Sequence, residues 1–228
     1  MKIGVVTFPG SNCDRDALAV AQYLPSAQSH SIWHKDTVLP TGLDLVIIPG
    51  GFSYGDYLRC GAIARFAPIM NEIITFANNG GYVLGICNGF QILTEAGLLP
   101  GVLLRNQSLS FVCKTTYLRV ENATTAFTSK YVHHDILSVP VAHGEGNYFA
   151  DAETIRALEF ENRIVFRYTT KNGEELPSAN PNGAINNIAG IINQQGNVLG
   201  MMPHPERVCD PVLGSADGLG IFQSLAHQ

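Results

Sequence analysis

The chain has 228 residues, 46% of them hydrophobic, so it can bury a large core, and we expect a single α/β domain over residues 1–228. Its formal net charge of −5, without a basic run, argues against nucleic acid or an anionic membrane surface as a partner. No apolar run approaches the ~18 residues that span a bilayer, and the chain begins on a strand-like segment instead of a signal peptide. We therefore expect a cytoplasmic protein.

The cysteines are odd in number, widely spaced, and include no CxxC pair or Cys/His cluster of the kind that binds a metal. In a reducing compartment they remain free thiols. The neighbouring His133 and His134 do not face one ligand sphere, so we expect no metal site. The five cysteines are Cys13, Cys60, Cys87, Cys113 and Cys209.

The first quarter of the chain alternates between strand-like and helical segments. Predicted strands cover residues 2–8, 31–34 and 44–49. Between the first two, apolar residues at helical spacing predict a helix over 14–24, with Ser11 or Asn12 as its cap. This alternation is typical of a parallel sheet with helices on both faces.

A glycine-rich loop over residues 49–57 follows the third strand. In an open parallel sheet, loops at the carboxyl ends of strands line the ligand crevice. We expect the backbone N–H of Gly51 or Phe52 to face an oxyanion there. A phosphate-binding loop is the alternative, but the lysine and Ser/Thr of a Walker A motif are missing.

A sharp turn centred on Cys87 is the main candidate for catalysis. A helix is expected over 62–78, then a buried strand over 81–86, and a second helix over 88–96. Gly85 and Gly89 flank the cysteine as in a nucleophile elbow. The first N–H groups of the new helix, including that of Asn88, would favour a thiolate and hold a developing oxyanion. The competing interpretation is a buried structural cysteine.

The second half of the chain reads as strands with few helices between them, which predicts an antiparallel excursion from the parallel sheet. A loop or exposed hairpin dense in turn formers is expected over 171–187, near the site. Strands are predicted at 102–104, 111–114, 117–120, 137–141, 164–168 and, as a final hairpin, 188–193 and 197–202. Helices are predicted at 152–161 and 217–226.

A loop over residues 142–148 contains a His/Glu pair among glycines. Gly144 and Gly146 would let the backbone approach a small polar ligand, and the Glu145 carboxylate could meet an ammonium group.

The last hairpin leads into a His-Pro-Glu segment. In an extended chain residues two apart project to the same side, so His204 and Glu206 can face one point, and the flanking prolines restrict the backbone. A thiol nucleophile needs a base, and the base needs an orienting acceptor. Cys87, His204 and Glu206 fit these three roles, although the histidine alone could equally belong to a surface loop.

Residues 85–91 and 203–206 together resemble the class I, or triad, glutamine amidotransferases. Residues 8–16, 50–59 and 142–146 are similar to motifs of the glutaminase subunits of phosphoribosylformylglycinamidine synthases. The resemblance implies an open, mostly parallel sheet flanked by helices. It also implies hydrolysis of L-glutamine through a Cys87 thioester, with N–H groups near Gly51 and Asn88 holding the intermediate. Gln91 is the candidate for the amino acid end of glutamine, or it bonds its own backbone.

The same resemblance implies partners for the chain. Nothing in the sequence would bind ATP, so ATP and Mg²⁺ are expected on a large synthetase subunit that uses the ammonia in purine biosynthesis, together with a small third subunit. Asn147 and Ser110 depart from the expected pattern, away from the triad. The alternatives are another Cys/His hydrolase of the same architecture, or a catalytically silent binding subunit.

Overall fold

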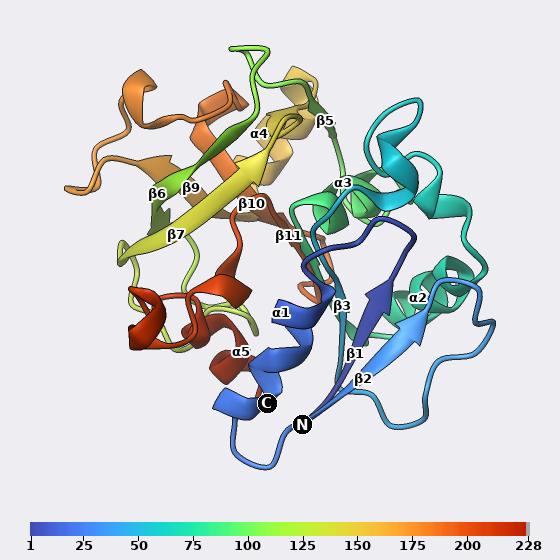
Figure 1. Ribbon diagram of the computed structural model, residues 1–228. Coiled ribbons are helices and arrows are strands. Elements are labelled where there is room, and N and C mark those ends of the chain that lie inside the picture. Colours follow the sequence, from blue (N-terminus) through green and yellow to red (C-terminus); the bar gives the residue numbers. More distant parts are fainter. Residues whose placement is uncertain (227–228) are drawn as a thin grey trace.

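The computed structural model describes residues 1–226, and its centre is a nine-stranded sheet with the order β2-β1-β3-β4-β11-β10-β9-β6-β7 (Figure 1). The strands of this sheet are β1 (Lys2–Thr7), β2 (Gln28–Trp33), β3 (Leu45–Ile48), β4 (Tyr82–Ile86), β6 (Val112–Val120), β7 (Ile136–His143), β9 (Ile164–Thr169), β10 (Ile188–Ile192) and β11 (Val198–Met201). A separate pair consists of β5 (Val102–Leu104) and β8 (Asn147–Phe149).

Two groups of helices cover the sheet. The helices are α1 (Asp14–Ala19), α2 (Pro68–Asn78), α3 (Asn88–Glu95), α4 (Ala152–Phe160) and α5 (Leu219–Leu225). Figure 1 shows α1 and α5 close together on the near face of the sheet. The β3-α2-β4 crossover runs in the opposite direction to β1-α1-β2, so right-handed connections place α2 on the other face. The α/β class with helices on both faces is confirmed.

The sheet divides into two halves. The strands from β2 to β11 pair in parallel, whereas β10, β9, β6 and β7 continue the sheet antiparallel. In the parallel half, every residue of β3 and β11 is buried, as expected of strands covered on both faces. The predicted excursion is therefore correct in kind, and it extends to four strands, of which β10 is the first strand of the final hairpin.

Several boundaries differ from the prediction. The strands predicted at 111–114 and 117–120 form one strand, β6, which begins at Val112, because the β-branched Thr115 and Thr116 continue its pairing with β7. The helix predicted over 62–78 begins only at Pro68, which stands at its first turn and leaves Ala67 extended.

The helix predicted over 14–24 is α-helical only to Ala19 and continues as a 3-10 turn over Val20–Tyr23. Its N-cap is Cys13, without a side-chain capping bond, so the proposed Ser11 or Asn12 cap is wrong. The loop over 171–187 connects β9 to β10 and holds the 3-10 turns Pro177–Ala179 and Ile185–Asn187.

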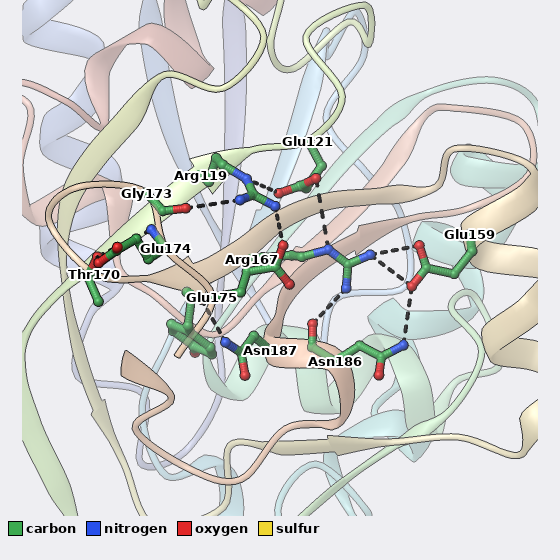
Figure 2. Close-up of polar contacts among 11 residues, drawn as sticks. Arg119, Glu121, Glu159, Arg167, Thr170, Gly173, Glu174, Glu175, Asn186 and Asn187 are labelled. Atoms are coloured by element: carbon green, nitrogen blue, oxygen red, sulfur yellow. Dashed lines mark hydrogen bonds and ion pairs between the residues drawn. The ribbon is translucent and has the colours of Figure 1, made fainter. Parts of the chain in front are cut away.

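The antiparallel half contains a network of ion pairs, drawn in Figure 2. Glu121 lies between Arg119, whose Nε is 2.6 Å from one carboxylate oxygen, and Arg167, whose Nε is 3.9 Å from the other. Arg167 Nη2 also donates to both carboxylate oxygens of Glu159, at 2.8 and 2.7 Å, and Arg119 pairs with Glu175. The side chain of Arg167 is only 10% exposed, whereas the side chains of Glu159 and Glu175 are 43% and 40% exposed, so the network is buried at its centre and reaches water at its ends.

Among residues 1–226, no helix combines the length and the apolar character needed to cross a membrane.

Candidate active site

The turn between β4 and α3 has the predicted geometry. Cys87 adopts φ 51° and ψ −106°, a conformation that L-residues rarely occupy, and its side chain is buried. Glycine is required on both sides. A Cβ on Gly89 would lie 1.8 Å from the carbonyl oxygen of Ile48, and one on Gly85 would lie 2.7 Å from the carbonyl oxygen of Gly89. The cysteine is thus held at the carboxyl end of the sheet by close main-chain packing.

Cys87 and His204 meet although 117 residues separate them in the chain. Strands β4 and β11 are parallel neighbours, and the Cys87 N–H donates to the Met201 carbonyl at 2.8 Å. Both segments therefore leave the sheet at the same edge. A Cβ placed on Gly50 would be 2.7 Å from His204 Cε1 and 3.4 Å from Cys87 Cβ. The two side chains converge on this glycine, as the sequence predicted.

His204 and Glu206 form the expected buried pair. His204 Nδ1 lies 2.6 Å from Glu206 Oε1, and neither side chain is appreciably exposed. Burial alone would lower the pKa of His204, but the Glu206 carboxylate and the neighbouring Cys87 outweigh it and hold that pKa well above its usual value. The main-chain N–H of His204 donates to the main-chain carbonyl of Pro140 in β7 at 2.9 Å. The antiparallel half of the sheet thus supports the imidazole.

The candidate oxyanion donors differ in their availability. The N–H of Phe52 donates to the Gly10 carbonyl at 3.0 Å, whereas the N–H of Gly51 makes no backbone hydrogen bond within residues 1–226. Asn88 is the first residue of α3, so its N–H has no partner inside the helix. Of the donors predicted from the sequence, Gly51 and Asn88 remain.

A cleft of about 240 Å³ opens in front of the Cys87 side chain. Gln91 lies in its wall, where Nε2 donates to the Glu145 carbonyl and Oε1 accepts a 2.9 Å bond from Asn88 Nδ2. The side chain therefore does not bond its own backbone. The cleft is lined by Gly51, Phe52, Asp56, Cys60, Cys87, Gln91, Arg105, Phe111, Ala142, His143, Gly144 and Glu145.

Charged residues at the far end of the cleft include some that the sequence analysis missed. Asp56 is half-buried, and burial together with the nearby Glu145 raises its pKa. Arg105 Nε is 3.7 Å from Glu145 Oε1, and the arginine is mostly exposed. Two carboxylates and a guanidinium thus share one end of the cleft with Gln91. Asp56 lies in the predicted glycine-rich loop, but only the fold brings that loop beside residue 145.

The 142–148 loop is fixed by a buried amide network. His143 Nδ1 is 3.1 Å from Asn106 Oδ1, and its Nε2 is 3.4 Å from Asn182 Nδ2. Burial lowers the pKa of His143 to about 4, so the ring is neutral near pH 7. The N–H of Gly146 donates to Asn106 Oδ1 at 3.0 Å and the residue does not line the cleft, unlike Gly144. Gly146 therefore positions the loop through its bond to Asn106. The prediction that it contacts a ligand in the cleft is wrong.

Part of the 171–187 loop is also buried, contrary to the expectation that it is exposed. Asn182 is 1% exposed because it packs against His143 and accepts the Ala184 N–H at 3.0 Å.

A metal ion does not fit the residues beside the triad. Cys13, His204 and Glu206 place ligand-type atoms within 4.8 Å of one another. However, Arg207 Nη2 donates to Cys13 Sγ at 3.0 Å, and a guanidinium so close opposes the binding of a cation.

Comparison with known proteins identifies the family. The model of the CobB/CobQ-like glutamine amidotransferase domain matches residues 1–218. The chain is 56% identical to the phosphoribosylformylglycinamidine synthase subunit PurQ of Moorella thermoacetica, with 99% of the chain and 95% of that protein covered. It is 57% identical to the PurQ subunit of Synechocystis sp., with coverages of 97% and 98%. The chain belongs to the PurQ family of glutamine amidotransferases.

Solved structures agree with this membership. A chain of the PurLQS structure from Thermotoga maritima is 40% identical and superposes with a TM-score of 0.85 over 99% of this chain and 97% of that one. The glutaminase domain of Trypanosoma brucei CTPS, solved with bound acivicin, has a TM-score of 0.61 at 13% identity and covers 100% and 94% of the two chains. The second likeness concerns the fold alone, which the PurQ family shares with more distant amidotransferases.

Proposed function

We propose that this chain is the glutaminase subunit of phosphoribosylformylglycinamidine synthase, which hydrolyses L-glutamine to glutamate and ammonia. The observation that carries the proposal is the meeting of the Cys87 and His204 side chains at Gly50, in a chain that covers 95% of its PurQ relative from Moorella thermoacetica. A catalytically silent subunit has no need for a strained nucleophile backed by a buried His/Glu pair.

The reaction begins when the Cys87 thiolate attacks the side-chain amide of glutamine. The oxygen of the tetrahedral intermediate accepts hydrogen bonds from the N–H groups of Gly51 and Asn88. His204, protonated and oriented by Glu206, gives its proton to the leaving nitrogen and later activates the water that hydrolyses the thioester. The raised pKa of His204 suits the first step, because the imidazole must carry a proton before ammonia leaves.

The amino acid end of glutamine fits the far end of the cleft. The carboxylates of Asp56 and Glu145 are suited to the α-ammonium group, and Arg105 is suited to the α-carboxylate. Asn88 and the Glu145 carbonyl hold the Gln91 side chain between them, so Gln91 links this end to the nucleophile turn.

The ammonia passes to an ATP-dependent synthetase subunit, which converts formylglycinamide ribonucleotide to formylglycinamidine ribonucleotide in purine biosynthesis. ATP and Mg²⁺ belong to that subunit, and a small third subunit completes the complex. This proposal is supported by the relatives, which are PurQ subunits of phosphoribosylformylglycinamidine synthase, and by the matching solved structure, which is that of PurLQS. We place the protein in the cytoplasm as one domain.

The decisive experiment compares two cysteine variants. The purified chain is incubated with glutamine, with and without the synthetase and third subunit, and glutamate release is measured. Cys87→Ala should lower it by about 10⁴-fold, whereas Cys113→Ala, the same change at an exposed thiol, should not. Full partner-dependent glutamine use by Cys87→Ala would contradict the proposal.

Covalent labelling provides a second test. A glutamine-like electrophile should modify Cys87 and spare the other four thiols, as read by mass spectrometry. A homologue of the electrophile that is one methylene longer should label Cys87 less well. A different Cys/His hydrolase with the same elbow would not distinguish the two reagents in this way.

A further inference from the structure

A second thiol lies beside the triad and has no role in glutamine hydrolysis. Cys13 precedes α1 and is 2% exposed. A Cβ placed on Gly50 would be 3.1 Å from Cys13 Sγ, close to the same point on which His204 and Cys87 converge. Gly50 has no side chain, so no Cβ fills the point at which the two cysteines and His204 come together. Two thiols from distant parts of the chain therefore flank one imidazole.

The charges around the cysteines distinguish Cys13 from the other thiols. Arg207 Nη2 donates to Cys13 Sγ at 3.0 Å, so a cation contacts this sulfur, and Cys13 Sγ in turn donates to Asn12 Oδ1 at 3.0 Å. Cys60 also lines the glutamine cleft, but burial and the carboxylates of Asp56 and Glu145 raise its pKa well above the usual range. Cys60 is thus held as an unreactive thiol.

The two remaining cysteines do not compete. Cys209 is buried, its Sγ bonds the Pro205 carbonyl at 3.2 Å, and burial raises its pKa to about 12. Cys113 is exposed on β6 and does not line the cleft. Cys13 is therefore the thiol whose position beside His204 and contact with the Arg207 guanidinium best suit a reaction with Cys87.

A small cavity reaches Cys13 and His204 from a different side than the glutamine cleft, which is lined by Cys87. It has a volume of about 150 Å³ and includes Cys13, His204 and Arg207 in its wall. Gly51 and Phe52 lie in the walls of both this cavity and the glutamine cleft. A small oxidant such as a hydroperoxide has room in this cavity, beside Cys13 and His204.

We propose that Cys13 is the resolving thiol of a redox switch, and that it forms a reversible disulfide with Cys87 when a hydroperoxide oxidises the nucleophile. The proposal rests on the assignment of Cys87 as the glutaminase nucleophile. The switch silences glutamine hydrolysis and protects Cys87 from irreversible oxidation.

The chemistry balances in two steps. The Cys87 thiolate attacks the O–O bond of hydrogen peroxide, which leaves a sulfenic acid on Cys87 and releases hydroxide. The Cys13 thiolate then attacks the Cys87 sulfur, the S–S bond forms, the S–O bond breaks, and a second hydroxide leaves. The two thiolates supply the two electrons that reduce the peroxide. A dithiol reductant then reduces the Cys13–Cys87 disulfide to two thiols and is itself oxidised to a disulfide.

The test uses the full chain exposed to hydrogen peroxide, followed by alkylation and peptide mass spectrometry. A Cys13–Cys87 cross-linked peptide should appear, with glutaminase activity lost and then recovered in dithiothreitol. Activity is measured with the synthetase partners added after oxidation and is normalised to each variant before oxidation. Before oxidation, the reduced chain is assayed for glutamate release. No release would contradict the proposed function, whereas release without a Cys13–Cys87 cross-link after oxidation would contradict only the switch.

Variants identify the resolving thiol. Cys13→Ser should lose activity under peroxide without recovery in dithiothreitol, because Cys87 proceeds to the sulfinic acid. Cys60→Ser and Cys113→Ser should recover like the parent chain. Recovery of Cys13→Ser to the parent level, a cross-link from Cys87 to Cys60, or peroxide-treated parent chain in which Cys87 stays a thiol would each overturn the proposal. The cross-link in the unmodified chain decides the matter if Cys13→Ser does not fold.

Discussion

Both halves of the sheet contain fully buried strands, β9 and β10 in the antiparallel half among them, and the antiparallel half adds a network of ion pairs. In the parallel half, strands β3 and β11 are entirely buried, and the Cys87 turn is fixed where Gly89 packs against the Ile48 carbonyl. In the antiparallel half, charged side chains are bridged across strands, with Glu121 between Arg119 and Arg167 (Figure 2). The nucleophile is thus placed by main-chain contact, which has little freedom, and the supporting strands are joined by longer side chains.

The comparison also separates chemistry from support. Cys87 and the segment that carries His204 both follow parallel strands, whereas β7 of the antiparallel half supplies the Pro140 carbonyl that bonds the His204 N–H. Damage to the parallel edge should therefore remove activity, and damage to the ion pairs should mainly lower stability.

After Cys87→Ala, Glu206→Gln should give the largest effect on activity in a chain that still folds. Glutamine cannot stabilise the imidazolium as a carboxylate does, so glutaminase kcat should fall by about 10³-fold with little change in KM. Steady-state kinetics in the presence of the synthetase partner measures it. Glu174→Gln, at an exposed glutamate of the antiparallel half, is the matched control, and an equal loss there would break the comparison.

Gly89→Ala should destabilise the parallel edge most strongly. Its Cβ would be 1.8 Å from a main-chain oxygen that cannot move freely, so we expect a loss of about 4 kcal/mol or failure to fold. Gly97→Ala is the control, since φ is +73° there but no atom lies within 4 Å, and about 1 kcal/mol is expected. Equal costs in urea unfolding would show that close packing does not define the elbow.

His143 should make the chain sensitive to acid. Its pKa in the folded state, about 4, lies below the ordinary 6.5, so the neutral ring stabilises the fold above pH 6.5 and that contribution is lost as pH falls toward 4. The loss at pH 4 should be about 3 kcal/mol. His143→Gln should flatten this part of the curve of unfolding free energy against pH. An unchanged curve would show that His143 is not the group responsible.

Arg167→Met should lower stability without touching the chemistry. It leaves the partly exposed Glu159 without its cation and Glu121 with Arg119 alone, and we expect a cost of about 2 kcal/mol. Glutaminase activity per folded molecule should be unchanged. Arg59→Met breaks the exposed pair with Glu95 and should cost only about 0.5 kcal/mol. A kcat loss in Arg167→Met would mean that the ion pairs belong to the site.

Local patterns were sufficient to predict the reactive segments. Flanking glycines identify the Cys87 turn because only glycine tolerates the contacts at Gly85 and Gly89, and the two-residue spacing of His204 and Glu206 places both on one side. The parallel alternation of strand and helix in the first half is equally readable, because each element there buries a periodic apolar face.

What the sequence by itself determined was the nucleophile turn, the His/Glu pair and the class of fold, since these depend on neighbours in the chain. Only the tertiary structure decided that Cys13 lies beside His204 and that Asp56 lies near Glu145. It also decided that Asn106 and Asn182 contact the ring of His143. Those contacts join residues between 37 and 191 positions apart. Their formation depends on strand order and loop packing, which short-range patterns do not encode.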